Sequence, residues 1–146
     1  KIKKGMIVCS DGTTLLKNVL SESFSGARLA CKKEDKTVYG VCSKESWFPG
    51  RLNWAHFDKD TCAISVNSLG NGRVWVTNIK GNVENGDYIC SSDIPGFGQL
   101  QSDGIMRNYT VAKATEAVDW DSVTDTITYN DVEYKKFLIS CTYHCG

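Results

Sequence analysis

Residues 86–100 have the sequence GDYICSSDIPGFGQL, in which a short apolar run lies between two turn signals. The run YIC at 88–90 follows Asn85-Gly86 and precedes Pro95-Gly96. Glycine and asparagine tolerate positive φ, and proline fixes φ at about −65°, so both dipeptides are typical of tight turns. We expect a strand between two turns, with the side chain of Asp93 capping the second turn.

The glycines and serines of this stretch also raise the question of an active-site loop. A phosphate-binding loop needs a helix N-terminus after its glycines and a Lys-Ser or Lys-Thr pair. Here Pro95 interrupts the pattern, and no such pair follows. The glycines are therefore interpreted as backbone geometry.

The same alternation of short strands and turns continues along the chain. β-branched and aromatic residues gather in runs, which are MIVCS (6–10), RLACK (28–32), TVYGVCS (37–43), CAISV (62–66), RVWVT (73–77), DYICS (87–91) and TITY (126–129). Turn dipeptides separate these runs, among them Asp11-Gly12, Ser25-Gly26, Pro49-Gly50, Asn71-Gly72 and Asp103-Gly104. The pattern predicts a mainly β fold, with residues 1–146 forming a single compact domain of short antiparallel strands and hairpins.

Two hairpins and room for one short helix follow from the local patterns. Asn130-Asp131 can adopt positive φ and is expected to join TITY to the strand after it. NSLGNG at 67–72 is expected to join CAISV to RVWVT in the same way. Residues 14–20 and 112–120 are the two candidates for the helix.

Size and charge exclude several functional classes. The 146 residues are enough for one domain with its own core, and 41% are hydrophobic against 23% charged. Seventeen Lys and Arg balance seventeen Asp and Glu, which argues against a nucleic-acid partner. No apolar run approaches the ~20 residues of a membrane-spanning helix, so no membrane partner is expected. Because the first residue is Lys1, we expect the chain to be part of a longer protein.

Seven cysteines are many for this length, and the number is odd. They are Cys9, Cys31, Cys42, Cys62, Cys90, Cys141 and Cys145. None has the C-x2-C spacing of a zinc or redox motif. Five lie in or beside apolar runs, which favours buried, reduced thiols; the alternative is a set of disulfides with one unpaired thiol.

Imidazoles, which nucleophilic catalysis would use as bases, occur only at His56 and His144. His144 lies in SCTYHCG, where Cys141, His144 and Cys145 are candidate metal ligands. Adjacent residues of a strand point to opposite faces, so His144 and Cys145 would not meet. Packing of a C-terminal strand is the favoured interpretation, and we expect no metal, no cofactor and no catalytic residue. His56 is interpreted as a loop contact.

A long aromatic loop is the main candidate for contact with a partner. Within residues 43–60, four side chains could form a subunit interface or a platform for a glycan: Trp47, Phe48, Trp54 and Phe57. The interface is favoured. Asn108 begins NYT, a glycosylation sequon that matters only in a secreted eukaryotic protein.

Three stretches, in this order, resemble a known family: KKGMIVCSDG (3–12), KTVYGVCSKES (36–46) and GRVWVTNIKGNVENGDYICSSDIPGFGQ (72–99). They are similar to the autoproteolytic intramolecular-chaperone domain at the C-termini of phage neck-appendage and tail-fibre proteins. Residues 82–120 and the ending FLISCTYHCG look closer to the branch in large algal viruses and environmental sequences. The resemblance covers residues 5–146, and residues 46–61 match poorly.

The resemblance implies a domain that helps a homotrimeric fibre to fold. In that family the domain then cuts itself from the fibre, using an acidic S-D-Y-A-E type motif just before the region that matches residues 1–10. No such motif is present in this chain, so no catalytic residue is carried over.

The expected function is therefore a structural and assembly module, the C-terminal chaperone-like trimerisation domain of a viral or phage-like fibre. It would be located on a virion or an extracellular appendage, as a homotrimer beside its parent fibre segment. The alternatives are a self-cleaving peptidase domain whose acidic motif lies upstream of this chain, and a glycan-binding fibre tip.

Overall fold

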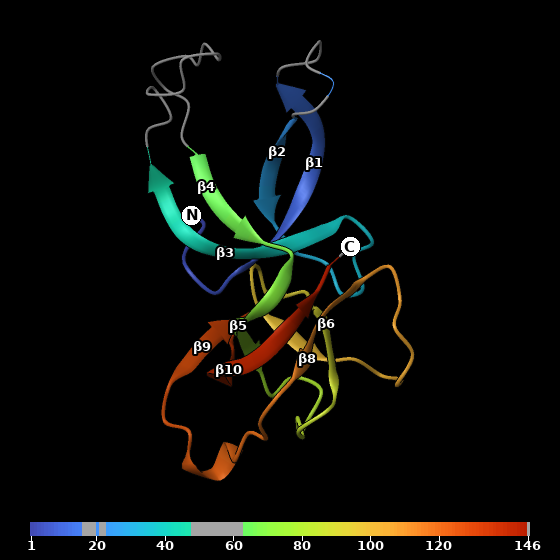
Figure 1. Cartoon of the computed structure of the whole chain (residues 1–146). Coiled ribbons are helices and arrows are strands. Elements are labelled where there is room, and N and C mark those ends of the chain that lie inside the picture. The colour runs from blue at the N-terminus through green and yellow to red at the C-terminus, as the bar shows by residue number, and fades with distance from the viewer. Residues whose placement is uncertain (16–19, 21–22, 48–62, 146) are drawn as a thin grey trace.

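The computed structural model describes residues 1–15, 20, 23–47 and 63–145 (Figure 1). These residues form β-strands, one 3-10 turn and no α-helix, which confirms the predicted mainly β class. The elements are β1 (Ile7–Leu15), β2 (Phe24–Leu29), β3 (Val38–Trp47), β4 (Ala63–Asn67), β5 (Leu69–Thr77), β6 (Tyr88–Ser91), β7 (Gly98–Leu100), β8 (Thr110–Ala114), η1 (Trp120–Ser122), β9 (Thr126–Tyr129) and β10 (Val132–His144).

The first four strands form an antiparallel sheet in the order β2-β1-β3-β4. Figure 1 shows the β1–β2 and β3–β4 pairs extending away from the other strands. The turn predicted at Asp11-Gly12 is instead a bulge within β1, where the register with β2 shifts between Ser10 and Thr14. Gly12 has a φ of 88° there, which glycine adopts without strain.

The remaining strands close into a small barrel. Their order is β5-β7-β6-β8-β10, and β10 also pairs with β5, so that the first and last strands meet. The β5–β7 pairing is parallel and joins Val76 to Gly98; the other pairings of the ring are antiparallel. β9 lies beside the first part of β10 as a hairpin. A closed ring removes the open edges that a flat sheet would leave.

One apolar core connects the sheet to the barrel. Its members include Ile7, Cys9 and Val41 from the sheet and Val74, Val76, Ile89, Val111 and Ile139 from the barrel. The predicted Pro95-Gly96 turn is confirmed, and it lies at this junction. The N–H of Gly96 donates to the carbonyl of Ala30 at 2.7 Å, and the N–H of Ile7 donates to the carbonyl of Gly96 at 2.9 Å. The turn therefore ties the barrel to the sheet.

The predicted hairpin at Asn130-Asp131 is confirmed. The two residues have φ values of 50° and 64°, and Tyr129 pairs with Val132 across the turn. Asn and Asp tolerate this conformation because their short polar side chains can hydrogen-bond locally.

The predicted hairpin across residues 67–72 is wrong, because β4 and β5 belong to different sheets. β4 pairs with β3, whereas β5 pairs with β10 and β7. Ser68 is the crossing point: its hydroxyl donates to the carbonyl of Tyr39 at 2.6 Å, and its carbonyl accepts from the N–H of Cys145 at 3.0 Å. Asn71-Gly72 lies inside β5 rather than in a turn, and Ser25-Gly26 lies inside β2.

Neither candidate helix is present among the described residues. Thr14 belongs to β1, and most of residues 16–20 lie outside the description. The candidate at 112–120 is wrong, because its first residues form β8 and only Trp120–Ser122 makes a 3-10 turn. Ala112 and Ala114 pair with Tyr143 and Cys141 of β10, and this long-range pairing outweighs the helical propensity of alanine.

Candidate functional site

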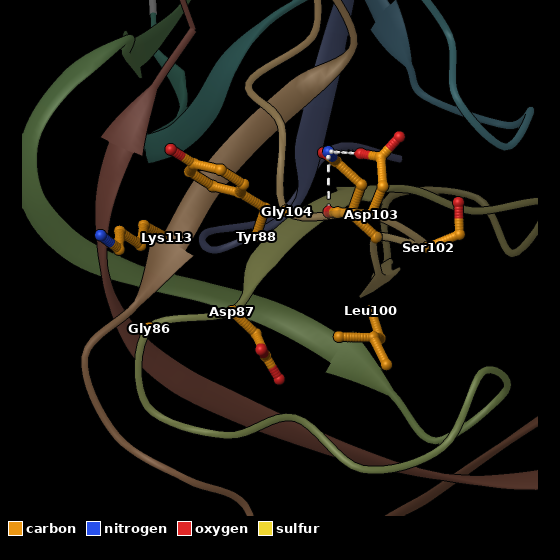
Figure 2. Close-up of a pocket in the computed structure, with 9 residues that line it drawn as sticks. Gly86, Asp87, Tyr88, Leu100, Ser102, Asp103, Gly104 and Lys113 are labelled. Carbon is orange, nitrogen blue, oxygen red and sulfur yellow. Dashed lines mark hydrogen bonds between the residues drawn. The ribbon is translucent and has the colours of Figure 1, made fainter.

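A groove lined by described residues lies on the outside of the barrel (Figure 2). It has a volume of about 390 Å³ and lies between β6, β8 and the segment after β7. The lining residues are Gly86, Asp87, Tyr88, Leu100, Gln101, Ser102, Asp103, Gly104 and Lys113. The groove is thus built from both ends of the stretch at 86–100 and from the loop that follows it.

Tyr88 and Lys113 form one side of the groove. They are directly paired residues of β6 and β8, so their side chains leave the sheet on the same face. The Lys113 ammonium lies 5.9 Å from the centroid of the Tyr88 ring. The Tyr88 ring makes a T-shaped contact with the His144 ring, with the two centroids 6.2 Å apart. The His144 imidazole shares a 2.8 Å hydrogen bond with the hydroxyl of Thr142. Within the described residues, Lys113 has no ion-pair partner.

A buried glutamine shapes the opposite wall. Gln101 is 3% exposed, and its amide nitrogen donates to the carbonyl of Ile105 at 2.7 Å and to the Asp103 carboxylate at 3.0 Å. Its amide oxygen accepts from the hydroxyl of Thr110 at 2.6 Å. Gln101 therefore holds both ends of the loop at 102–109 in place.

An ion pair fixes the same loop on its outer side. Arg107 donates to the Asp103 carboxylate at 2.8 Å. This hydrogen bond, together with that from Gln101, lowers the pKa of Asp103 below its usual range. The negative charge of Asp103 is thus already compensated within the loop.

The floor of the groove is the turn at Asn85-Gly86, and this predicted turn is confirmed. Gly86 has a φ of 96°, and its N–H donates to the carbonyl of Ala114 at 2.8 Å. The Asp87 carboxylate accepts from the N–H of Glu84 at 2.8 Å. In Figure 2 the Asp87 carboxylate is directed away from the Tyr88 ring. The lining thus presents an aromatic ring, a lysine, two carboxylates and a serine hydroxyl.

A second polar cluster lies buried between the sheet and the barrel, around Asp35. Its carboxylate accepts from the N–H of Thr37 at 2.9 Å, from the Thr37 hydroxyl at 2.6 Å and from Arg28 at 3.1 Å. Burial acts to raise the pKa of Asp35, but these hydrogen bonds outweigh it and lower the pKa to about 2. Ser91 completes the cluster, accepting from the N–H of Asp35 and donating to the carbonyl of Lys32. Because every partner is internal, the cluster is structural.

The prediction that the side chain of Asp93 caps the turn at Pro95-Gly96 is wrong. Its carboxylate accepts from the N–H of Lys33 at 2.9 Å, so it connects the barrel to the segment after β2. Ser92 caps the turn instead: its hydroxyl donates to the carbonyl of Phe97 at 2.6 Å and accepts from the N–H of Ile94 at 3.2 Å.

The aromatic candidates fall almost entirely outside the description. Trp47 is the last residue of β3, and Phe48, Trp54 and Phe57 lie outside the described residues, as does His56. Their assignment as an interface or a glycan platform therefore stays a prediction.

The candidate metal ligands at the end of β10 are not brought together. Cys141 and Cys145 are buried, and the thiol of Cys145 donates to the carbonyl of Val111 at 3.4 Å. His144 is half-buried and bonds to Thr142. In the part of the chain that is described, no group of three or more His, Cys, Asp or Glu residues could hold a metal ion. The alternation of buried and half-buried residues is that of the predicted packed strand.

The six described cysteines are free thiols, and only Cys31 among them is exposed. Burial raises the pKa of Cys90 to about 11 and the pKa values of Cys141 and Cys145 to about 12. Such thiols stay protonated at neutral pH and are poor nucleophiles. Five of the six described cysteines are therefore buried free thiols, as predicted for most of them, whereas Cys31 is exposed.

Asn108, the first residue of the sequon, is exposed on the surface. Thr110, the third residue of the sequon, is buried, and its hydroxyl is engaged with Gln101 and with the N–H of Arg107.

Sequence reasoning missed Tyr88 and Lys113. Neither belongs to a motif, and only the pairing of β6 with β8 brings them together. Asn85-Gly86 signalled the floor of the groove, but a turn dipeptide carries no information about which side chains lie beside it.

Among the residues with described structure, none forms a helix of the length and apolarity that a membrane crossing requires. In comparisons with protein families, curated proteins and solved structures, none matches the chain.

Proposed function

We propose that this domain is a structural assembly module that associates with copies of its own chain, as expected for a C-terminal trimerisation domain of a viral or phage-like fibre. The observation that carries the proposal is the incomplete coverage of the projecting sheet. All six residues of β2 are half-buried, and so are four of the five residues of β4. A strand that packs one face on a core alternates between buried and exposed residues, so neither face of these strands is fully covered.

These two half-buried strands, β2 and β4, are also the edge strands of their sheet. Among the described residues, β2 pairs only with β1, and β4 pairs only with β3. The outer side of an edge strand is where a strand of another chain can pair. The barrel offers less edge for pairing with another chain, because its ring is closed. Its edge strand β9 is short and has exposed threonines at positions 126 and 128.

Charge supports a second copy as the occupant. The chain carries equal numbers of basic and acidic residues, and its pI is about 6.9. Proteins with a net charge near zero repel their own copies least. Association through the projecting sheet would cover Phe24, Ala27 and Leu29 of β2 and Ile64 and Val66 of β4.

Light scattering after size exclusion tests this proposal. At tens of micromolar, the wild-type domain should have three times its chain mass of 16.1 kDa. Ala27→Lys on β2 and Ser65→Lys on β4 place a charge on each edge and should shift the protein toward monomer. Thr128→Lys on β9 is the matched control and should leave the trimer intact. A wild-type monomer, or equal dissociation by all three variants with unchanged circular dichroism, would overturn the proposal.

A further inference from the structure

We infer that the groove beside Tyr88 and Lys113 binds a carboxylated sugar. This function is independent of self-association, because the groove lies on the barrel and the proposed contact lies on the projecting sheet. The cavity of about 390 Å³ falls within the ~300–1,000 Å³ of ordinary ligand sites. It is large enough for a monosaccharide unit.

The anionic part of the ligand is indicated by Lys113. Lys113 lines the cavity, and its ammonium has no ion-pair partner among the described residues. The two carboxylates of the lining do not pair with the Lys113 ammonium: Asp103 is paired with Arg107, and Asp87 accepts from the backbone N–H of Glu84. A ligand carboxylate would supply the missing counter-charge, with a charge-assisted hydrogen bond.

The sugar part is indicated by the combination of an aromatic ring with polar groups. The Tyr88 ring lies in a T-shaped arrangement 6.2 Å from the His144 ring, and it offers an apolar surface against which a pyranose ring can lie. The hydroxyls of Tyr88 and Ser102 can each donate and accept a hydrogen bond, as sugar hydroxyls require. Leu100 adds apolar surface at the other end of the lining.

The wall that would meet the ligand is already ordered in the free protein. The buried amide of Gln101 accepts from the hydroxyl of Thr110 and donates to the carbonyl of Ile105 and to two oxygens of Asp103. Arg107 anchors Asp103 from the outside. A preformed wall lowers the entropy lost on binding, which favours recognition of a small ligand.

Titration of the whole domain with sodium glucuronate, followed by two-dimensional NMR, tests this inference. We expect saturable binding with a dissociation constant on the order of 1 mM, and shifts at the amides of Tyr88, Gly104 and Lys113. Glucose and sodium acetate should each bind at least about tenfold more weakly, because each lacks one half of the recognised chemistry.

Lys113→Met removes the charge while keeping most of the side-chain length, and it should abolish the preference for glucuronate over glucose. Lys80→Met, an exposed lysine on another part of the surface, is the matched control and should bind as the wild type does. Absence of saturable shifts with glucuronate up to about 20 mM would overturn the inference. Equal shifts with acetate would overturn the sugar assignment, and a Lys113→Met variant that retains the preference would overturn the role of the ammonium.

Discussion

The hydroxyl of Tyr143 bonds to both backbone groups of Arg73: it accepts from the N–H at 2.8 Å and donates to the carbonyl at 2.7 Å. Tyr143 lies on β10 and Arg73 on β5, the two strands whose pairing closes the barrel. The Tyr143 side chain therefore provides hydrogen-bond partners for both backbone groups of Arg73, where β5 and β10 close the barrel. Tyr143 is itself 6% exposed, so its hydroxyl is withdrawn from water.

Tyr143→Phe should lower the free energy of unfolding by roughly 1 to 3 kcal/mol, because it leaves two backbone groups of Arg73 without partners. Urea unfolding monitored by circular dichroism measures the change. Tyr129→Phe, on a half-buried tyrosine of β9, is the control and should change the stability by no more than about 0.5 kcal/mol. Equal effects of the two substitutions would contradict the structural role of the Tyr143 hydroxyl.

Gly72→Ala should destabilise the domain by about 2 kcal/mol, since a Cβ at this position would overlap the hydroxyl and ring of Tyr143. Gly104→Ala is the matched control, because its Cβ would meet no atom within 4 Å. In the double variant Gly72→Ala/Tyr143→Leu the overlap is removed, so its loss of stability should be at least about 1 kcal/mol smaller than the sum of the single losses. Strictly additive losses would show that the overlap is not the cause.

The same pair explains one limit of the sequence prediction. Asn71-Gly72 has the composition of a hairpin turn, and a local interpretation makes β4 and β5 partners. The structure uses Gly72 for a different reason: its missing side chain leaves space for Tyr143, which is far away in sequence. Asn130-Asp131, in contrast, joins strands that are neighbours in sequence, and its turn could be predicted from the dipeptide alone.

The groove shows the same division between local and long-range information. Its floor could be predicted, because the turn at Asn85-Gly86 depends on backbone preferences of those residues. The side formed by Tyr88 and Lys113 could not be predicted, because these residues meet only through the register of β6 with β8. Similarly, the serines at 91 and 92 gave no indication that the first accepts from the backbone N–H of Asp35 and that the second caps a turn.

Asp35→Asn should cost about 2 kcal/mol of stability at pH 7. The folded-state pKa of about 2 lies below the ordinary value of 3.8, so the ionised carboxylate stabilises the fold above pH 3.8. That contribution is lost as the pH falls through about 2, because protonation then occurs in the folded state as well. The stability gap between wild type and variant should therefore narrow between pH 5 and pH 2 in urea unfolding experiments. A gap that does not depend on pH would contradict the role of the charge.

Alkylation with iodoacetamide at pH 8 should distinguish Cys31 from the buried cysteines. The thiolate is the reactive species, and burial raises the pKa values of Cys90, Cys141 and Cys145 while also excluding the reagent. Peptide mapping by mass spectrometry should show Cys31 modified at least about tenfold faster than these three in the folded protein. In 8 M urea, as a control for intrinsic reactivity, all four rates should become similar. Modification of Cys141 or Cys145 at the rate of Cys31 without denaturant would contradict their placement in the core.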